Sequence, residues 1–206
     1  KSRVIHSNNM STFKNSTYNI GIDEVGRGPI AGPVAVGAFV FLKPEARKIF
    51  RGVKESKQLT EEKREGWFGK IIEAQKIGLV DFIVTFQSEE IIDTKGLSFA
   101  IKKCLEKSLE KLNLDCKDCL VLLDGGLKAP EKYKNQKTII KGDEKEMVIA
   151  LASICAKVTR DRYMRKMAVK YPDYGFDVHK GYGTKKHYKI IKKCGLIALH
   201  RRSFLL

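Results

Sequence analysis

The most constraining feature of the sequence is residues 20–33, where a short apolar strand runs into two adjacent carboxylates and a glycine-rich turn. Asp23 and Glu24 follow the apolar residues, and a Gly-Arg-Gly turn occupies residues 26–28. Carboxylate oxygens are preferred ligands of hard divalent cations, while bare backbone N–H groups and an arginine bind phosphates. A site with both kinds of group indicates phosphodiester chemistry. The alternative is ordinary turn formation, for which an acidic residue before glycine is common.

The net charge of the chain favours a polyanionic partner. The 206 residues fit one domain, and a hydrophobic content of 43% is enough for a core. There are 40 Lys and Arg residues against 24 Asp and Glu, which gives a formal charge of +16. Basic groups gathered on one face release counterions when they bind nucleic acid. Charge alone fits a merely solvated surface equally well.

The hydrophobic pattern predicts three early strands followed by alternating strands and helices. The predicted strands span residues 18–22, 34–42, 79–86, 119–123 and 138–140. The predicted helices span residues 61–75, 89–112 with a break near Gly96, and 144–170, the last ended by Pro172. Thr60 and Ser88 are placed to cap the first two helices. This order predicts an α/β layer fold with a mixed sheet flanked by helices. Residues 1–17 are polar and are expected to be a flexible lead-in to a domain over residues 18–172.

Acidic residues follow three of the predicted strands, each beside a glycine. They are Asp23 with Glu24, Asp124 and Asp143. In α/β sheets, functional groups gather just beyond strand ends. Four carboxylates brought together would raise one another's pKa, and divalent metal would relieve that repulsion. Two such ions can activate a water and stabilise a leaving oxygen in phosphodiester hydrolysis. Taken individually, Asp124 and Asp143 fit helix capping or turn formation as well.

Three stretches of the chain resemble motifs of the type 2 ribonucleases H, the family of bacterial ribonuclease HII. The pattern from Gly21 to Val34 closely resembles the first motif, and the type 3 relatives lack its Gly-Arg-Gly triplet. Residues 122–125 resemble the second acidic motif. Residues 140–143, followed by 152–162, resemble the third.

The resemblance implies a ribonuclease H-like fold and a set of metal-binding, catalytic carboxylates. These are Asp23, Glu24, Asp124 and Asp143. Asp161, between two arginines on a predicted helix, is given only a surface ion pair.

The resemblance also reaches the substrate-binding groups. Residues 180–184, Lys-Gly-Tyr-Gly-Thr, match a family motif whose tyrosine stacks on the sugar beside the cleaved bond. This implies that Tyr182 senses the ribonucleotide, and that Gly26, Arg27 and Gly28 hold its 2′-hydroxyl and the neighbouring phosphates. Without the motif, a tyrosine plugging a turn would be the simpler interpretation.

Ser56 and Lys57 match family positions that contact phosphate. Here Glu55 precedes them, where most members have Asp. If that Asp shapes the phosphate-binding loop, the longer Glu weakens the assignment of both residues.

The last part of the chain is uniformly basic. From Lys180 to Leu206 there are eight Lys and Arg residues and no acidic ones. Lys185 and Lys189 are predicted to lie on one helix after a Thr184 cap. A run of one sign beside an active site predicts a phosphate track over residues 173–206, with Lys180, Lys185 and Lys189 as contacts. A solvated helix face is the alternative.

The resemblance implies a metal-dependent endonuclease that acts through two divalent ions, Mg²⁺ or Mn²⁺. Its substrates would be the RNA strand of RNA/DNA hybrids and the phosphodiester 5′ to a ribonucleotide embedded in duplex DNA. Direct attack by water would leave 3′-hydroxyl and 5′-phosphate ends. An all-oxygen site suits Mg²⁺ or Mn²⁺ and not zinc. The alternatives are a type 3 enzyme or another nuclease of this fold, and a basic nucleic-acid-binding protein without catalysis.

Cysteine usage and hydropathy indicate a cytoplasmic protein with no membrane partner. The five cysteines include one isolated C-x-x-C, Cys116 to Cys119, and show no disulfide-scaffold spacing. Cys155 falls in an apolar helical pattern and is expected in the core. No run approaches the roughly 18 apolar residues that span a bilayer. The protein is expected to act as a monomer.

Overall fold

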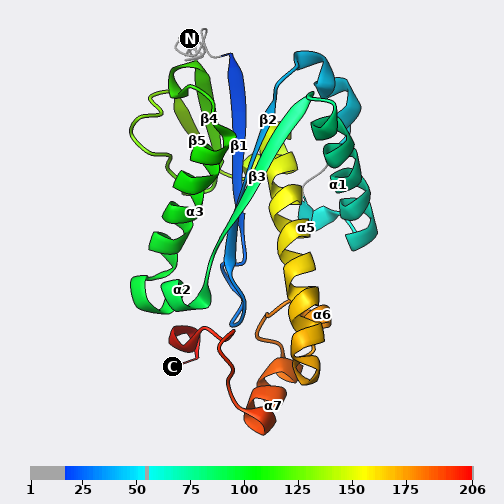
Figure 1. Cartoon of the computed structure of the whole chain (residues 1–206), viewed down its shortest axis with the longest axis vertical. Helices are drawn as coiled ribbons and strands as arrows, with labels where there is room; N and C mark the ends of the chain where they lie inside the picture. The colour runs from blue at the N-terminus through cyan, green and yellow to red at the C-terminus, as the bar shows by residue number, and fades with distance from the viewer. Residues whose placement is uncertain (1–16, 54–55, 206) are drawn as a thin grey trace, which may run out of the picture.

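The structure, a computed structural model, describes residues 17–53 and 56–205. Residues 1–16 of the predicted lead-in, and Glu55, lie outside the described residues. The described chain contains a five-stranded mixed sheet in the order β3-β2-β1-β4-β5 (Figure 1). Its strands are β1 (Tyr18–Val25), β2 (Val34–Phe41), β3 (Val80–Gln87), β4 (Cys119–Asp124) and β5 (Gln136–Ile139). β1, β2 and β3 pair antiparallel, whereas β4 and β5 continue the sheet from β1 in parallel. The predicted mixed sheet is confirmed.

Helices cover both faces of this sheet (Figure 1). α1 (Glu61–Lys76) and α5 (Met147–Lys170) lie on one face, and α2 (Glu89–Lys95) and α3 (Leu97–Leu112) on the other. The shorter helices are α4 (Gly142–Lys145), α6 (Phe176–His179) and α7 (Lys185–Cys194). Short 3₁₀ turns span Pro44–Phe50, Ser56–Gln58, Cys116–Asp118, Pro172–Tyr174 and Arg202–Phe204. Thr60 and Ser88 cap α1 and α2 as predicted, each accepting a backbone N–H three residues on.

Two helix breaks can be compared with the sequence prediction, and one of them was not predicted. The break near Gly96 is confirmed, because Gly96 has a φ of 85° and separates α2 from α3. The predicted helix over residues 144–170 is instead two helices. Glu146, with an extended backbone at φ −123°, separates α4 from α5. Asp143 therefore lies on the short helix α4 and not on the long helix α5.

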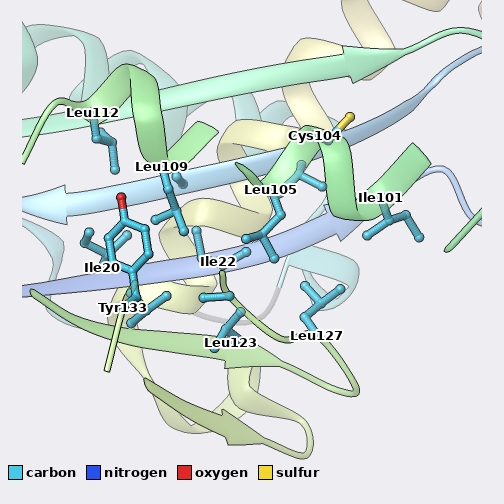
Figure 2. Close-up of a cluster of buried hydrophobic side chains, with 14 of the residues drawn as sticks. Ile20, Ile22, Ile101, Cys104, Leu105, Leu109, Leu112, Leu123, Leu127 and Tyr133 are labelled. Atoms are coloured by element: carbon cyan, nitrogen blue, oxygen red, sulfur yellow. The ribbon is translucent and has the colours of Figure 1, made fainter. Parts of the chain in front are cut away.

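A separate hydrophobic cluster lies on each face of the sheet. On the α3 side, Ile20 and Ile22 of β1 pack with Leu105 and Leu109 (Figure 2). On the α5 side the cluster includes Phe39, Ile71 and the fully buried Cys155, which confirms the core position expected for that thiol. Because β2 is covered on both faces, all eight of its residues are buried.

The approach of α5 to the sheet depends on Gly21 in β1. A Cβ at this position would overlap the backbone carbonyl group of Val148, at the start of α5. Since that obstacle is main chain, no rotamer change could relieve it. The small residue therefore sets how closely α5, which carries Ser153 and Arg160, approaches the strand that carries Asp23.

The C-terminal segment packs against the far end of α5. A small cluster joins Met164 of α5 to Tyr174, Phe176 and Leu199. Backbone hydrogen bonds then tie this segment to the β1–β2 loop, including Gly32 N–H to the Leu199 carbonyl at 2.8 Å. Among the described residues, no helix is both long enough and apolar enough to cross a membrane.

Candidate active site

Asp23 and Asp124 are brought together by the parallel pairing of β1 and β4. The register places Ile22 opposite Leu123, so the two aspartates occupy the next positions on neighbouring strands. β4 ends at Asp124, whereas β1 continues to Val25 in pairing with β2, so Asp23 and Glu24 lie within the strand and not after its predicted end at residue 22. Burial raises the pKa of Asp23 to about 7, and the charges of Glu24 and Asp124 add to this effect. The site therefore concentrates negative charge where water screens it poorly.

Glu24 extends the site towards α3. Its Oε1 accepts a hydrogen bond from Arg27 Nη1 at 2.9 Å, which links the acidic pair to the Gly-Arg-Gly turn. Its Oε2 is buried and has no hydrogen-bond partner among the described residues. Burial raises the pKa of Glu24, although Arg27 opposes the shift. Glu24 also lines a cavity of about 780 Å³ between α3 and the loop after β4.

Asp143 reaches the site from a short helix, and this corrects one prediction. β5 ends at Ile139, Lys141 adopts a left-handed conformation at φ 55°, and Asp143 lies in the first turn of α4. The strand cannot run on to Asp143 because the left-handed residue turns the chain. Asp124 Oδ1 accepts the Gly142 N–H at 2.6 Å, which fixes α4 beside the end of β4. Asp143 is buried, with Oδ2 3.7 Å from Lys57 Nζ.

Sequence reasoning missed Ser153 as a site residue. Ser153, on α5, hydrogen-bonds Asp23 and partly offsets the rise in its pKa. Its hydroxyl is also 2.8 Å from that of Ser56, which is buried. The sequence showed Ser153 only as one of several small residues that allow close helix packing. Ser56, predicted to contact phosphate, instead has its hydroxyl bonded to Ser153, and its phosphate contact stays a prediction.

The donor set fits a hard divalent cation in its chemistry. The nearby side-chain oxygens come from the carboxylates and from the Ser153 hydroxyl, and the Oε2 of Glu24 has no hydrogen-bond partner among the described residues. Within residues 17–53 and 56–205, no three His, Cys, Asp or Glu side chains already form a ligating group. The charge of Asp124 acts on both Asp23 and Glu24, and Asp143 follows Gly142, whose N–H Asp124 accepts.

The Gly-Arg-Gly turn and Tyr182 face each other. Gly26 has a φ of 91°, which starts the turn as β1 ends. A Cβ built on Gly28 would lie 3.7 Å from Cε1 of Tyr182, so the tyrosine ring lies alongside this glycine. The ring is 42% exposed and open to a ligand. The backbone N–H groups of Ile30 and Ala31 both donate to the Gly181 carbonyl, which joins the two loops.

The predicted lysine contacts fall into two groups. Lys185 and Lys189 are exposed on α7, and Thr184 caps this helix as predicted by accepting the His187 N–H. Lys180 is buried instead. Its ammonium group donates to the Asp177 carbonyl and lies 3.9 Å from Glu61 Oε2. Lys180 is therefore engaged by the protein, while Lys185 and Lys189 reach solvent.

Arg160 and Asp161 of α5 differ from what the sequence indicated. Asp161 pairs with Lys157 at 2.9 Å, so the predicted ion pair is present, but it is buried and not on the surface. Arg160 is fully buried, and its guanidinium donates to the carbonyls of Pro33 and Lys180. The alternating charges of this stretch gave no signal that a buried arginine would link the β1–β2 loop to the loop at Lys180.

Comparison with known proteins identifies the family. The family model described as Ribonuclease HII matches residues 20–206. The chain belongs to the ribonuclease HII family. A Ribonuclease HII from Caldicellulosiruptor bescii is 43% identical over 185 residues, covering 90% of this chain and 85% of the relative. Members of this family are type 2 ribonuclease H endonucleases, so this chain is an enzyme that hydrolyses phosphodiesters of nucleic acid.

Solved structures give the same fold. The ribonuclease H2 of Pyrococcus horikoshii matches with a TM-score of 0.71 at 27% identity, covering 90% of this chain and 93% of that one. Bst-RNase HIII, solved in complex with Mn²⁺, matches with a TM-score of 0.62 at 20% identity, covering 94% and 66%. The predicted ribonuclease H-like fold is confirmed. At its lower identity, the type 3 neighbour shows the fold alone.

Proposed function

We propose that this ribonuclease HII family member cleaves the RNA strand of RNA/DNA hybrids and the phosphodiester 5′ to a ribonucleotide embedded in duplex DNA. The observation that carries the proposal is the position of Arg27. Its side chain pairs with Glu24 of the acidic site, and its backbone belongs to the turn that faces Tyr182. Arg27 thus connects the proposed catalytic carboxylates with the turn and the tyrosine that we propose recognise the sugar.

In this proposal Asp23, Glu24, Asp124 and Asp143 hold divalent cations, Mg²⁺ or Mn²⁺. The support is the all-oxygen donor set, the raised pKa of Asp23 and the unpartnered oxygen of Glu24. Bound there, the cations supply activation of water and stabilisation of the departing 3′-oxygen. The direct attack of water leaves a 3′-hydroxyl and a 5′-phosphate.

The protein's own residues position the substrate. Tyr182 stacks on the sugar at the scissile junction, while Gly26, Arg27 and Gly28 hold its 2′-hydroxyl and the adjoining phosphates. Lys57, beside Asp143, and the exposed Lys185 and Lys189 contact phosphates further along. Ser153 orients the Asp23 carboxylate by hydrogen bonding. Residues 173–206 form the substrate-binding segment, and one chain supplies the whole site, so we expect a monomer to be active.

The test is a duplex with one ribonucleotide in one DNA strand, incubated with Mg²⁺, with Mn²⁺ or with a chelator. We expect metal-dependent cleavage on the 5′ side of the ribonucleotide, with a 3′-hydroxyl on the upstream product. Gel-shift binding without cleavage would instead identify a non-catalytic nucleic-acid-binding protein. Cleavage of hybrids but not of this duplex would point to type 3 specificity. Sedimentation of the active enzyme tests the monomer.

A further inference from the structure

Two neighbouring residues near the end of the described chain contact both halves of the proposed ribonucleotide-reading surface. Arg201 is fully buried, and its guanidinium donates to three carbonyls of the β1–β2 loop. The distances are 2.7 Å to Gly26, 3.1 Å to Arg27 and 2.9 Å to Gly32. The first two of these carbonyls belong to the Gly-Arg-Gly turn itself.

The contacts of Arg201 dictate which way the turn presents its N–H groups. In a trans peptide the carbonyl and the N–H of one peptide unit point in opposite directions, and the described chain has no cis peptide. When the Gly26 and Arg27 carbonyls point inward to Arg201, the N–H groups of Arg27 and Gly28 must point outward. Neither N–H donates to another group within residues 17–53 and 56–205. Both are therefore available to a hydroxyl or a phosphate oxygen.

His200 reaches the opposite half through a second histidine. His187 Nδ1 is 2.9 Å from the Tyr182 carbonyl and must donate to it, because a carbonyl only accepts. The remaining nitrogen, Nε2, then accepts from His200 Nε2, 3.2 Å away. His200 Nδ1 in turn accepts the Ile197 N–H at 3.0 Å. This chain of bonds fixes the backbone beneath the Tyr182 ring.

His200 and Arg201 are themselves fixed by contacts with the β1–β2 loop. The Arg201 N–H donates to the Ile30 carbonyl, and His200 forms an isolated β-bridge with Ala31. Arg201 stacks over the Phe204 ring at 5.2 Å. Burial and the nearby Arg160 lower the pKa of Arg201 to about 10, and Glu89 and Asp93 partly offset that shift. The three loop carbonyls give the buried guanidinium hydrogen-bond partners in place of water, as a buried charge requires.

We propose that His200 and Arg201 are positioning residues that hold the Gly26–Gly28 turn and Tyr182 at a fixed separation, as one surface for reading a ribonucleotide. The inference rests on the proposed function. Neither side chain touches the substrate. Arg201 turns the N–H donors outward on one side of the sugar, and His200 acts through His187 to place the stacking ring on the other.

The main test is Arg201→Lys, which keeps the charge but has one nitrogen where three carbonyls need donors. We expect kcat/KM for the single-ribonucleotide duplex to fall about tenfold to a hundredfold, the effect of losing hydrogen bonds to a charged group. The metal concentration for half-maximal rate should stay unchanged. Arg51→Lys, the same change at an exposed arginine outside residues 173–206, is the matched control and should keep the wild-type value.

A second variant guards against a folding defect in the first. His187→Phe breaks the path from His200 to Tyr182 but keeps an aromatic ring in the cluster. Its effect on kcat/KM should be non-additive with that of Tyr182→Ala.

Chemical rescue tests Arg201 directly. Methylguanidinium added to the Arg201→Ala variant should restore part of the lost rate. Wild-type kcat/KM in Arg201→Lys and His187→Phe, or a loss accompanied by a shifted metal midpoint and no rescue, would overturn the proposal.

A spectroscopic readout separates this inference from the proposed function. In ¹⁵N–¹H spectra without substrate, Arg201→Lys should shift the amide signals of Arg27 and Gly28, and Arg51→Lys should not. This result is expected even if the wild-type enzyme fails to cleave the single-ribonucleotide duplex, an outcome that would reject only the proposed function. Unmoved Arg27 and Gly28 signals in Arg201→Lys would reject the positioning role.

Discussion

Asp124 combines a structural role with a proposed chemical one at a single side chain. Its Oδ1 accepts the Gly142 N–H and so holds α4 beside β4, while its charge contributes to the raised pKa values of Asp23 and Glu24. An amide of the same shape keeps the acceptor oxygen but removes the charge. The two roles can therefore be separated by one substitution.

We expect Asp124→Asn to abolish cleavage while hybrid binding persists, because the fold is kept and the charge that holds metal is lost. Cleavage assays over a range of metal concentrations, with gel-shift binding beside them, measure both effects. The control is Asp115→Asn, where an exposed carboxylate caps a 3₁₀ turn at the other end of β4. Wild-type rates in Asp124→Asn at matched metal concentration would remove Asp124 from the site.

Tyr182 should affect recognition and not metal binding. Stacking of an aromatic ring is worth about 1–3 kcal/mol, so Tyr182→Ala should lower kcat/KM on the single-ribonucleotide duplex about tenfold to a hundredfold. Tyr182→Phe keeps the ring and should retain most activity. A double-mutant cycle with Arg27→Ala should be non-additive, because we propose that both residues hold the same sugar. A shifted metal midpoint with intact ribonucleotide selectivity would contradict this role.

At the residue scale, the sequence predicted those positions whose chemistry is visible in a local motif. Asp23 and Glu24 adjoin a distinctive turn, and Tyr182 stands between two glycines. Ser153 could not be found in this way, because its partner Ser56 is 97 positions away. The burial of Lys180 was equally hidden, since Glu61, the acidic residue near its ammonium group, is supplied by a different helix.

Among the helices, α7 presents a testable charged face. Lys185 and Lys189 are one turn apart and exposed, as a phosphate track requires. We expect Lys185→Ala combined with Lys189→Ala to weaken hybrid binding and lower the log–log salt slope by roughly one unit for each lost contact. The chemical step at saturation should hardly change.

The matched control for the α7 pair uses the same spacing on another helix. Lys107→Ala with Lys111→Ala removes two exposed charges from α3. A salt slope that changes equally in both double variants would reflect net charge alone. An unchanged slope in the α7 variant would show that these lysines form an ordinary solvent-exposed face and contact no phosphate.

The histidine cluster behind Tyr182 makes stability depend on pH. Burial lowers the pKa of His187 to about 4, and His179 and His200 are lowered for the same reason. The unfolded chain takes up a proton near pH 6.5, before the folded one does, so the stability contributed by His187 is lost as pH falls towards about 4. The measurable quantity is the difference in unfolding free energy between wild type and His187→Gln, from urea titrations.

This difference in unfolding free energy should shrink from pH 7 to pH 4.5. The titration of the carboxylates affects both proteins equally and cancels in the difference. Subtracting the variant removes the opposing effect of Asp23, whose pKa is raised. A difference that is constant over this range would show that His187 is as easily protonated in the folded protein as in the unfolded one.

At the element scale, the strands were predicted because their apolar runs are short and bounded by turn residues. The break at Glu146 was not predicted, because residues 144–170 keep helical spacing on both sides of it. Only the structure shows the extended backbone of Glu146. Likewise, the sequence predicted a mixed sheet, but not that β1 would lie between β2 and β4. That arrangement comes from long-range pairing.

For the whole molecule, the contact between α5 and β1 at Gly21 is the most sensitive point of the fold. Gly21→Ala forces a methyl group against the Val148 main chain. Overpacking of this kind costs about 1–3 kcal/mol, so we expect a lower melting temperature and a site displaced with α5. Thermal unfolding followed by circular dichroism measures the change.

Gly66→Ala is the control for the same substitution. Gly66 lies within α1 with nothing near its Cβ position, so the change should stabilise the helix by about 1 kcal/mol. Equal melting temperatures for Gly21→Ala and wild type would mean that α5 can shift at no cost, contrary to the close packing described.

Arg201 and the turn it holds stand far apart along the chain, and this has a consequence for synthesis. The Arg27 carbonyl and the Arg201 guanidinium are separated by 174 positions. A growing polypeptide therefore exposes the turn long before the ribosome has added the residue that aims it. Contacts this distant in sequence also close slowly during folding. In the growing chain, Asp23, Glu24 and the turn are thus made well before Arg201, so we expect the turn to take its final orientation only after Arg201 has been added.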